Sequence, residues 1–296
     1  SHPNDAVTVA GEAFPHLLYQ FRLAYSGWRS VTVVRGGESY AALASGLQRA
    51  LRQAGGSPQE HRTDSLSAAR NNQVNRWTDQ YQSLCEHYGL RPTTNNLGQS
   101  HENGAIECAH GSLKRRINQA LKLRGSRDFA SQEDYQAFVD RVVERLNRGI
   151  KNRFAEERST LRPLPYDGVA DFAELSVKVT RTATIEVRHV LYTVPSRLVG
   201  QRLRVHLYHD HLEAYVGGEP VFQRERLYPG KGQSRARAVD YRHVIHCLAA
   251  KPQAFRHSQL RDDLLPNEAY RKLWALADAQ FEAHAACRWI VGLLRL

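Results

Sequence analysis

Hydrophobic and polar positions first alternate along the chain and then recur at helical spacing. Apolar residues occupy every second position across residues 19–25, the period of a half-buried strand. After a turn at residues 26–28, the β-branched run at residues 31–34 predicts a returning strand. Residues 40–54 then carry apolar side chains at helical spacing, and Gly55-Gly56 predicts the end of that helix.

Further along, the pattern predicts a short strand that ends at Asp64 and a helix over residues 76–88. The polar stretch at residues 93–104 is expected to be an active-site loop or a solvated connection. Another helix follows after Ser131, which we expect to be its N-cap. Strands, helix and strand in this order are typical of an α/β RNase H-like core, although several α/β folds share the order.

The helix expected to begin at Ile106 carries charged residues beside its buried stripe. Glu107 lies at the edge of the stripe, and Lys114 follows two turns later with Arg115 beside it. A carboxylate near the helix start could bind a metal ion, and the two cations further along the same face could bind the phosphate backbone of a nucleic acid. A surface helix with a first-turn Glu that complements the helix dipole would give the same pattern. The stripe itself comprises Ile106, Leu113, Ile117, Ala120 and Leu121.

The second half of the chain changes in composition. Residues 151–168 contain Pro163 and Pro165, which exclude regular helix, and we expect a linker there. Several short segments rich in Val, Thr and Ile follow within about 60 residues and predict a small β-barrel over residues 169–228. The predicted domains are therefore an α/β core of RNase H-like element order over 1–150, the linker, the barrel, and a basic linker with an α-helical C-terminal region over 229–296.

Residues 229–239 are rich in Gly and Arg, and they include Arg235 and Arg237. They could follow a phosphate backbone, or they could form a plain basic linker. Beyond them the apolar stripes are helical, and we expect packing or self-association there. The stripe residues are Trp274, Leu276, Phe281, Trp289, Ile290 and Leu293.

Composition narrows the class of partner. The 296 residues carry a formal net charge of +11 with a pI near 9.7, which favours a polyanion as ligand. The four cysteines form no C-x-x-C pair, so neither a disulfide framework nor a zinc ribbon is indicated. No apolar run is long enough for a membrane span, and we expect no membrane partner. The chain contains no Met, so we expect that Ser1 is not the natural start.

The residues around the two carboxylates resemble a known family. Thr63-Asp64 is followed by His101-Glu102-Asn103-Gly104-Ala105-Ile106-Glu107 and by Gly111-Ser112-Leu113-Lys114-Arg115-Arg116-Ile117. These sequence motifs resemble those of the IstA-type insertion-sequence transposases, which belong to the DDE transposase and retroviral integrase superfamily.

The resemblance implies a DNA transposase that acts by metal-dependent phosphoryl transfer. Asp64 and Glu107 would be catalytic ligands of two Mg²⁺ ions, with Mn²⁺ as a substitute. The enzyme would cleave the 3′ ends of the transposon and join each 3′-OH to target DNA. Lys114 and Arg115, together with Arg235 and Arg237, are the expected DNA contacts.

The resemblance also implies partners and a setting. These are transposon-end DNA and target DNA, a homo-multimer in a synaptic complex, and an ATPase helper protein in a bacterial cytoplasm, close to the nucleoid. The superfamily's first Asp is expected upstream of Ser1, with Asp5 exposed and directed away from the site.

Two other function classes compete. A metal-dependent nuclease of the same fold would share the carboxylates and would cut without joining. A non-catalytic DNA-binding module would explain the positive charge but not the pairing of Asp64 with Glu107.

Overall fold

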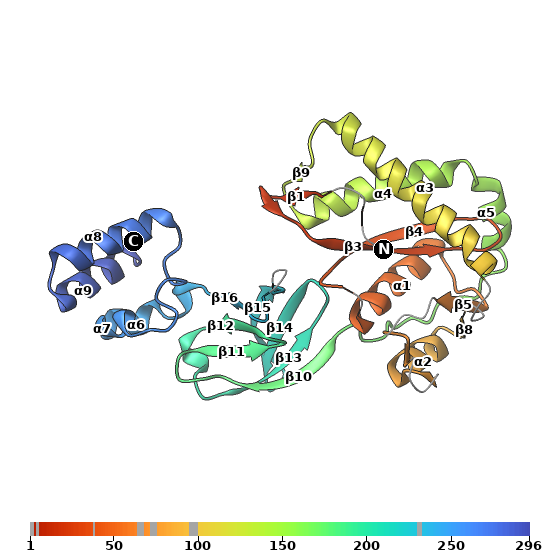
Figure 1. Cartoon of the computed structure of the whole chain (residues 1–296). Helices are drawn as coiled ribbons and strands as arrows, with labels where there is room; N and C mark the ends of the chain where they lie inside the picture. Colours follow the sequence, from red (N-terminus) through yellow and green to blue (C-terminus); the bar gives the residue numbers. More distant parts are fainter. Residues whose placement is uncertain are drawn as a thin grey trace. The chain divides into compact units, whose positions relative to one another are not determined.

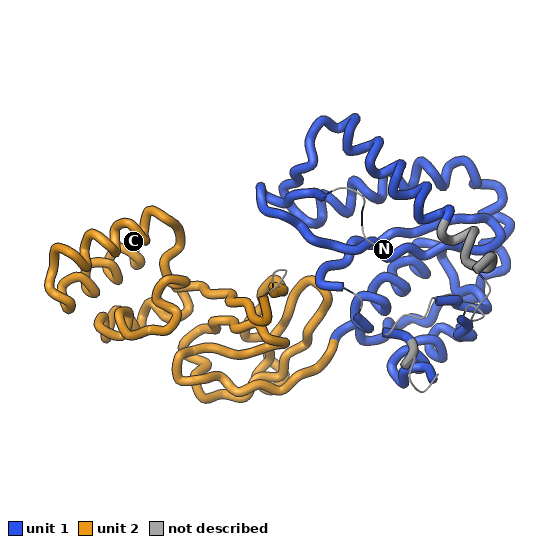
Figure 2. The backbone as a smooth tube through the Cα atoms, viewed as in Figure 1, with its two compact units in different colours: residues 1–172 blue, residues 173–296 orange. Residues whose placement is uncertain are grey.

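The computed structural model describes residues 3, 6–37, 39–63, 68–71, 76–94, 100–229 and 233–296, with the backbone alone at 70–71 and 100–107. The chain divides into two compact units, Ser1–Phe172 and Ala173–Leu296 (Figure 2). The first unit is mixed α/β, and the second contains two small sheets and a group of helices (Figure 1).

A two-stranded antiparallel sheet lies at the centre of the first unit. Strand β3 (His16–Arg22) pairs with β4 (Arg29–Arg35), and Leu18 lies opposite Val33. The turn between them places Gly27 at φ 75°, a left-handed conformation that glycine adopts without strain. The predicted strands are therefore confirmed, although β3 begins three residues earlier than the first residue of the alternating pattern.

One face of this sheet packs against α1 (Tyr40–Ala54). Ser39 caps the helix by accepting a hydrogen bond from the Ala42 N–H, and Gly55 ends it in the left-handed conformation, as predicted. Gly46 lets the helix approach the sheet, because a Cβ there would lie only 2.4 Å from the Tyr19 ring. The core on this face also takes in residues of α2 (Asp79–His87).

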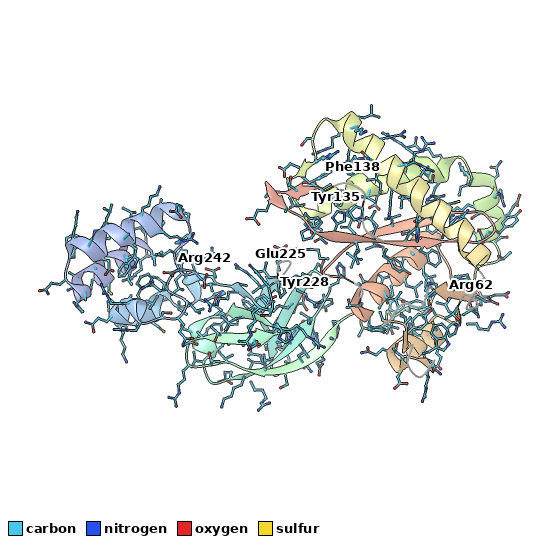
Figure 3. The ribbon with its side chains drawn as sticks, viewed as in Figure 1. Arg62, Tyr135, Phe138, Glu225, Tyr228 and Arg242 are labelled. Atoms are coloured by element: carbon cyan, nitrogen blue, oxygen red, sulfur yellow. The ribbon has the colours of Figure 1, made fainter. Side chains whose placement is uncertain are left out.

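The opposite face packs against α3 (Ser100–Arg124) and α4 (Gln132–Arg148), which lie side by side (Figure 1). Ser131 caps α4 through the Asp134 N–H, as predicted. Tyr135 and Phe138 project from α4 into this second core (Figure 3). The predicted stripe of α3 is confirmed at its described positions, where Leu113, Ile117 and Leu121 are buried and Ala120 packs beside them; Ile106 lies outside the described side chains.

Helix α3 corrects one expectation. Residues 100–104 are helical, so α3 begins before Ile106 and the expected loop or connection does not extend to residue 104. Adding one residue to an existing helix costs little compared with nucleating it, and the 25-residue α3 therefore tolerates a poor helix former such as Gly104.

Two further strands of the first unit are parallel. Strand β5 (Glu60–Thr63) pairs with β8 (Arg91–Thr94), and α2 lies between them in the sequence. The remaining elements of this unit are β1 (Thr8–Val9), β2 (Glu12–Ala13), β6 (Arg70–Asn71), β7 (Arg76–Trp77), β9 (Asp128–Phe129) and α5 (Lys151–Arg158).

The segment expected to be a linker is more ordered than its prolines suggested. It begins with α5, and the Phe154 ring stacks on Trp28 with centroids 5.0 Å apart. Ser57 then exchanges backbone hydrogen bonds with Arg162, and Val169 pairs with the Gln48 side chain. Residues 151–169 are therefore packed along the first unit.

The second unit contains two sheets around one apolar core. The first sheet has the order β10-β13-β14-β15 and the second has the order β11-β12-β16. Their bounds are β10 (Ala173–Lys178), β11 (Thr184–Val187), β12 (Val190–Thr193), β13 (Arg202–Leu207), β14 (His211–Val216), β15 (Glu219–Glu225) and β16 (Ala236–Ala238), with a short 3-10 helix η1 (Ser196–Leu198).

The prediction of a β-barrel is corrected in one respect, because no strand pairing joins the two sheets within the described residues. The chain leaves the first sheet at a tight turn after β10. There the Thr180 N–H donates to the Thr184 carbonyl, and Ala183 adopts φ 55°. The strands therefore enclose a core without closing into a ring.

The predicted helical region at the C-terminus is present. It comprises η2 (Tyr241–His243), α6 (Ile245–Ala250), α7 (Gln253–Arg256), α8 (Glu268–Gln280) and α9 (Ala283–Leu293). Trp274 and Ile290 are buried as expected, whereas Leu276, Phe281 and Trp289 are exposed. The expected stripe was too wide, since α8 and α9 each bury only one narrow face.

Candidate functional site

The parallel pair β5–β8 provides the frame of the candidate site. Thr63 and Thr94 are opposite each other in the register and are the last residues of their strands. The carboxyl ends of the two strands therefore meet at one edge, the position at which α/β sheets commonly hold functional side chains. Asp64 follows Thr63 directly in the sequence.

The predicted carboxylates themselves fall outside what the structure describes. Asp64 and Asp5 lie outside the described residues, and Glu107 is described only as part of the α3 backbone. The helical position of Glu107 agrees with the predicted helix. The pairing of the two side chains stays a prediction.

A buried polar pair supports β5 just before Asp64. The His61 ring lies 2.8 Å from the Tyr81 hydroxyl through Nδ1 and stacks on Phe21 with centroids 6.1 Å apart. Burial lowers the pKa of His61 to about 4, because the apolar surroundings disfavour the imidazolium. His61 is therefore neutral at pH 7. Its contact with Tyr81 links β5 to α2 without adding a charge close to the strand end.

Lys114 and Arg115 occupy different environments on α3. Arg115 is exposed, while Lys114 is half-buried and lines a small cavity beside Leu18 and Tyr135. The Lys114 stem therefore packs against the apolar core of this face, a common arrangement for a long cationic side chain. Both residues lie in the second half of α3, beyond Glu107 in the sequence.

Arg235 and Arg237 also differ from each other. Arg235 is exposed, whereas Arg237 forms an ion pair with Asp263 at 3.0 Å. Residues 236–238 form β16, which pairs in parallel with β12, so the segment is partly a strand and the interpretation as a plain linker is wrong there. Asp263 already neutralises part of the Arg237 charge.

The sequence did not reveal a buried carboxylate at Asp240. Its side chain accepts hydrogen bonds from the Arg242 guanidinium and backbone N–H, and it pairs with Arg224 of β15 at 3.1 Å. The hydrogen bonds from Arg242 hold the pKa of Asp240 well below its usual range. The Asp-x-Arg spacing was a local signal that could have been noticed. The contact with Arg224 depends on the tertiary fold.

Three histidines, His206, His209 and His211, lie close together in the sequence of the second unit. His209 is buried, and His211 lies 2.6 Å from an Asp210 carboxylate oxygen. Across the residues that the structure describes, no group of three or more His, Cys, Asp or Glu side chains could hold a metal ion. Within the same part of the chain, no helix has the length and apolar character needed to cross a membrane.

One comparison with known families bears on the class of protein. Residues 164–236 match the family model of the Mu transposase C-terminal domain. The match begins shortly before β10, extends through the two-sheet region and ends at the first residue of β16. It supports a transposase or integrase relationship for this chain.

Two further similarities are weaker guides. The chain is 44% identical over 296 residues to the uncharacterized protein y4jA/y4nE/y4sE of Sinorhizobium fredii. The alignment covers 98% of this chain but only 58% of that relative's length. A chain of the cryo-EM structure of the simian T-cell lymphotropic virus intasome in complex with PP2A regulatory subunit B56 gamma matches at 14% identity. Its TM-score of 0.40, over 76% of this chain and 77% of that one, is too low to carry an argument.

Proposed function

We propose that this chain is part of an IstA-type DNA transposase that cleaves the 3′ ends of a transposon and joins them to target DNA. The observation that carries the proposal is the match of residues 164–236 to a transposase domain. The Glu-Asn-Gly-x-x-Glu motif that ends at Glu107 supports the proposal independently, because the motif lies outside the matched residues.

Asp64 and Glu107 would hold the metal ions in this proposal. Carboxylate oxygens are the donors that Mg²⁺ prefers, and Asp64 follows a strand end at which such ligands are commonly placed. When bound, two Mg²⁺ ions would activate the attacking oxygen and stabilise the leaving oxygen, with Mn²⁺ as a substitute. The neutral His61–Tyr81 pair would keep the end of β5 in position without competing for the metal.

The basic residues would hold the DNA. Lys114 and Arg115 would contact phosphates close to the cut, and Arg235 and Arg237 would contact them at a distance from it. The second unit offers more such groups, since the solvated side of β10 and β13 presents Lys178, Arg202 and Arg204. Several phosphate contacts of this kind give affinity without sequence specificity.

The proposal includes the wider assembly. Transposon-end DNA and target DNA would be held by a homo-multimer in a synaptic complex, assisted by an ATPase helper protein. We place this activity in a bacterial cytoplasm, in contact with the nucleoid.

A joining assay tests this function. The natural protein that carries this chain is incubated with labelled duplexes of the transposon ends, a supercoiled target plasmid and Mg²⁺. We expect labelled ends to become covalently joined to the plasmid, and a chelator should prevent both cutting and joining. Cut ends that are never joined would instead assign the chain to the nuclease class.

A further inference from the structure

A groove between α3 and α4 has an apolar lining and a basic rim. It has a volume of about 330 Å³, and its lining includes Leu123, Phe138 and Val142. Phe138 and Val142 are nearly buried in the core, while Leu123 is 86% exposed. The volume is at the lower end of the range for small-ligand pockets, about 300–1,000 Å³, and suits one large side chain.

Three arginines line the same groove, and no acidic residue does. Arg124 is already held in place, because it donates to the Ser126 and Asp128 carbonyls and covers the Phe129 ring at 4.1 Å. Arg141 and Arg145 are exposed one helical turn apart, and neither forms an ion pair with another described residue. The groove therefore favours an apolar side chain with a carboxylate beside it.

The same unit displays a side chain of this kind at Tyr166. Its ring is fully exposed, and the exposed Asp167 follows it. The backbone around it is fixed, because the Asp167 carbonyl accepts a hydrogen bond from the His87 ring at 2.8 Å and Val169 exchanges two hydrogen bonds with Gln48. An anchored segment that exposes a large aromatic ring is pre-organised for binding.

Tyr166 cannot fill the groove of its own chain. Leu164 and Val169, on either side of it, pack against the core that contains α1, whereas Phe138 and Val142 belong to the core on the other face of the β3–β4 sheet. The sheet separates the two features. Any contact between them must therefore join two copies of the chain, either reciprocally across a two-fold axis or head-to-tail.

We propose that Tyr166 of one copy inserts into the α3–α4 groove of a second copy, with Asp167 facing Arg141 and Arg145. This contact specifies the multimeric assembly included in the proposed function and rests on it. DNA is the weaker candidate for the groove, because a phosphate backbone would satisfy the arginines but would leave the exposed Leu123 without an apolar partner.

Sedimentation velocity of the natural protein, alone and with an end duplex, tests the contact. Leu123→Glu places a charge in the groove, and Tyr166→Ser removes the inserted ring; both positions are exposed, so the fold should be retained. Val199→Glu, which adds the same charge at an exposed aliphatic residue of the second unit, is the matched control. We expect each groove or ring variant to weaken self-association roughly tenfold, and the control to associate like wild type.

Mixing the two variants gives the sharpest result. Each retains one intact half of the contact, so the mixture should form pairs but no larger assemblies through this contact. A wild-type protein that remains monomeric with and without DNA, unaltered association of both variants, or a mixture that forms no pairs would overturn the proposal. Lower DNA affinity of Leu123→Glu with normal association would assign the groove to DNA. Asp64→Asn should associate normally, so a failure here is separable from a failure of the proposed chemistry.

Discussion

The two compact units differ in how their sheets are covered. In the first unit, helices cover both faces of β3–β4, and a parallel pair of strands brings two carboxyl ends to one edge. In the second unit, short strands enclose an apolar core and present a solvated basic face. In the proposed function, the first unit would carry the chemistry and the second unit would supply much of the DNA contact.

The largest effect should come from the carboxylates of the first unit. We expect Asp64→Asn and Glu107→Gln each to abolish end cleavage and joining while DNA affinity stays nearly unchanged. Removing a metal ligand disables the reaction, whereas affinity comes from many phosphate contacts. Cleavage assays and filter binding on the same preparations measure both quantities. Normal strand transfer by either variant would contradict the assignment of the chemistry to these carboxylates of the first unit.

Acid should weaken the first unit through His61. Its pKa is about 4 in the folded chain and 6.5 when unfolded, so between these values the unfolded state binds more protons and stability falls as pH falls. The loss amounts to about 3 kcal/mol on going from pH 6.5 to about 4. Urea unfolding of wild type and His61→Gln across this range measures it. His16 is common to both proteins, so the two pH profiles should differ only by the His61 contribution; identical profiles would contradict its assignment.

The second unit should depend on Asp240. Asp240→Asn removes a charge that is paired with Arg224 and Arg242, and we expect a loss of about 2 kcal/mol in the free energy of unfolding, since Arg242 is largely exposed. Asp263→Asn breaks the exposed pair with Arg237 and should cost about 1 kcal/mol or less. Equal losses in thermal unfolding would refute the special position of Asp240.

Single DNA contacts should have smaller effects. Lys114→Ala and Arg115→Ala should each reduce the slope of log affinity against log salt by about one, because one phosphate contact fewer releases fewer counterions. Lys272→Ala on α8 provides a control for the general loss of one exposed positive charge. A slope that is the same in all three variants would assign Lys114 and Arg115 to ordinary solvated positions.

The smallest effect is the expected difference in salt slope between variants of Arg235 and Arg237, the two arginines at β16. Arg235→Ala should lower the salt slope like Lys114→Ala, whereas Arg237→Ala should lower it less because Asp263 already pairs with Arg237. Titrations of the two variants against the same duplex measure the difference. A larger loss for Arg237 would show that DNA displaces Asp263.

Much of the fold could be predicted because local patterns agree with the packing. Alternation located β3, a β-branched run located β4, and Gly55 and Ser131 marked helix ends by their capping chemistry. Helix boundaries were predicted less accurately where an existing helix extends through poor helix formers. Helix α3, for example, starts at Ser100 rather than at Ile106. The open two-sheet arrangement could not be predicted, since the composition of short strands does not specify which of them pair.

The candidate site was predictable only in part. The sequence motifs around Asp64 and Glu107 predict two carboxylate ligands, whose pairing stays a prediction, and the strand before Asp64 is present. The His61–Tyr81 pair, the contact of Asp240 with Arg224 and the arginine-lined groove each join separate elements of the fold, so no local pattern predicts them.

Metal rescue tests the central claim most directly. In the joining assay, Asp64→Cys and Glu107→Cys should be inactive with Mg²⁺, which binds thiolates poorly, and partly active with Mn²⁺, which accepts sulfur more readily. Lys114→Cys, which is not a proposed ligand, should show no such metal dependence. Activity of Asp64→Cys equal to wild type in Mg²⁺ would contradict the assignment of Asp64 as a metal ligand.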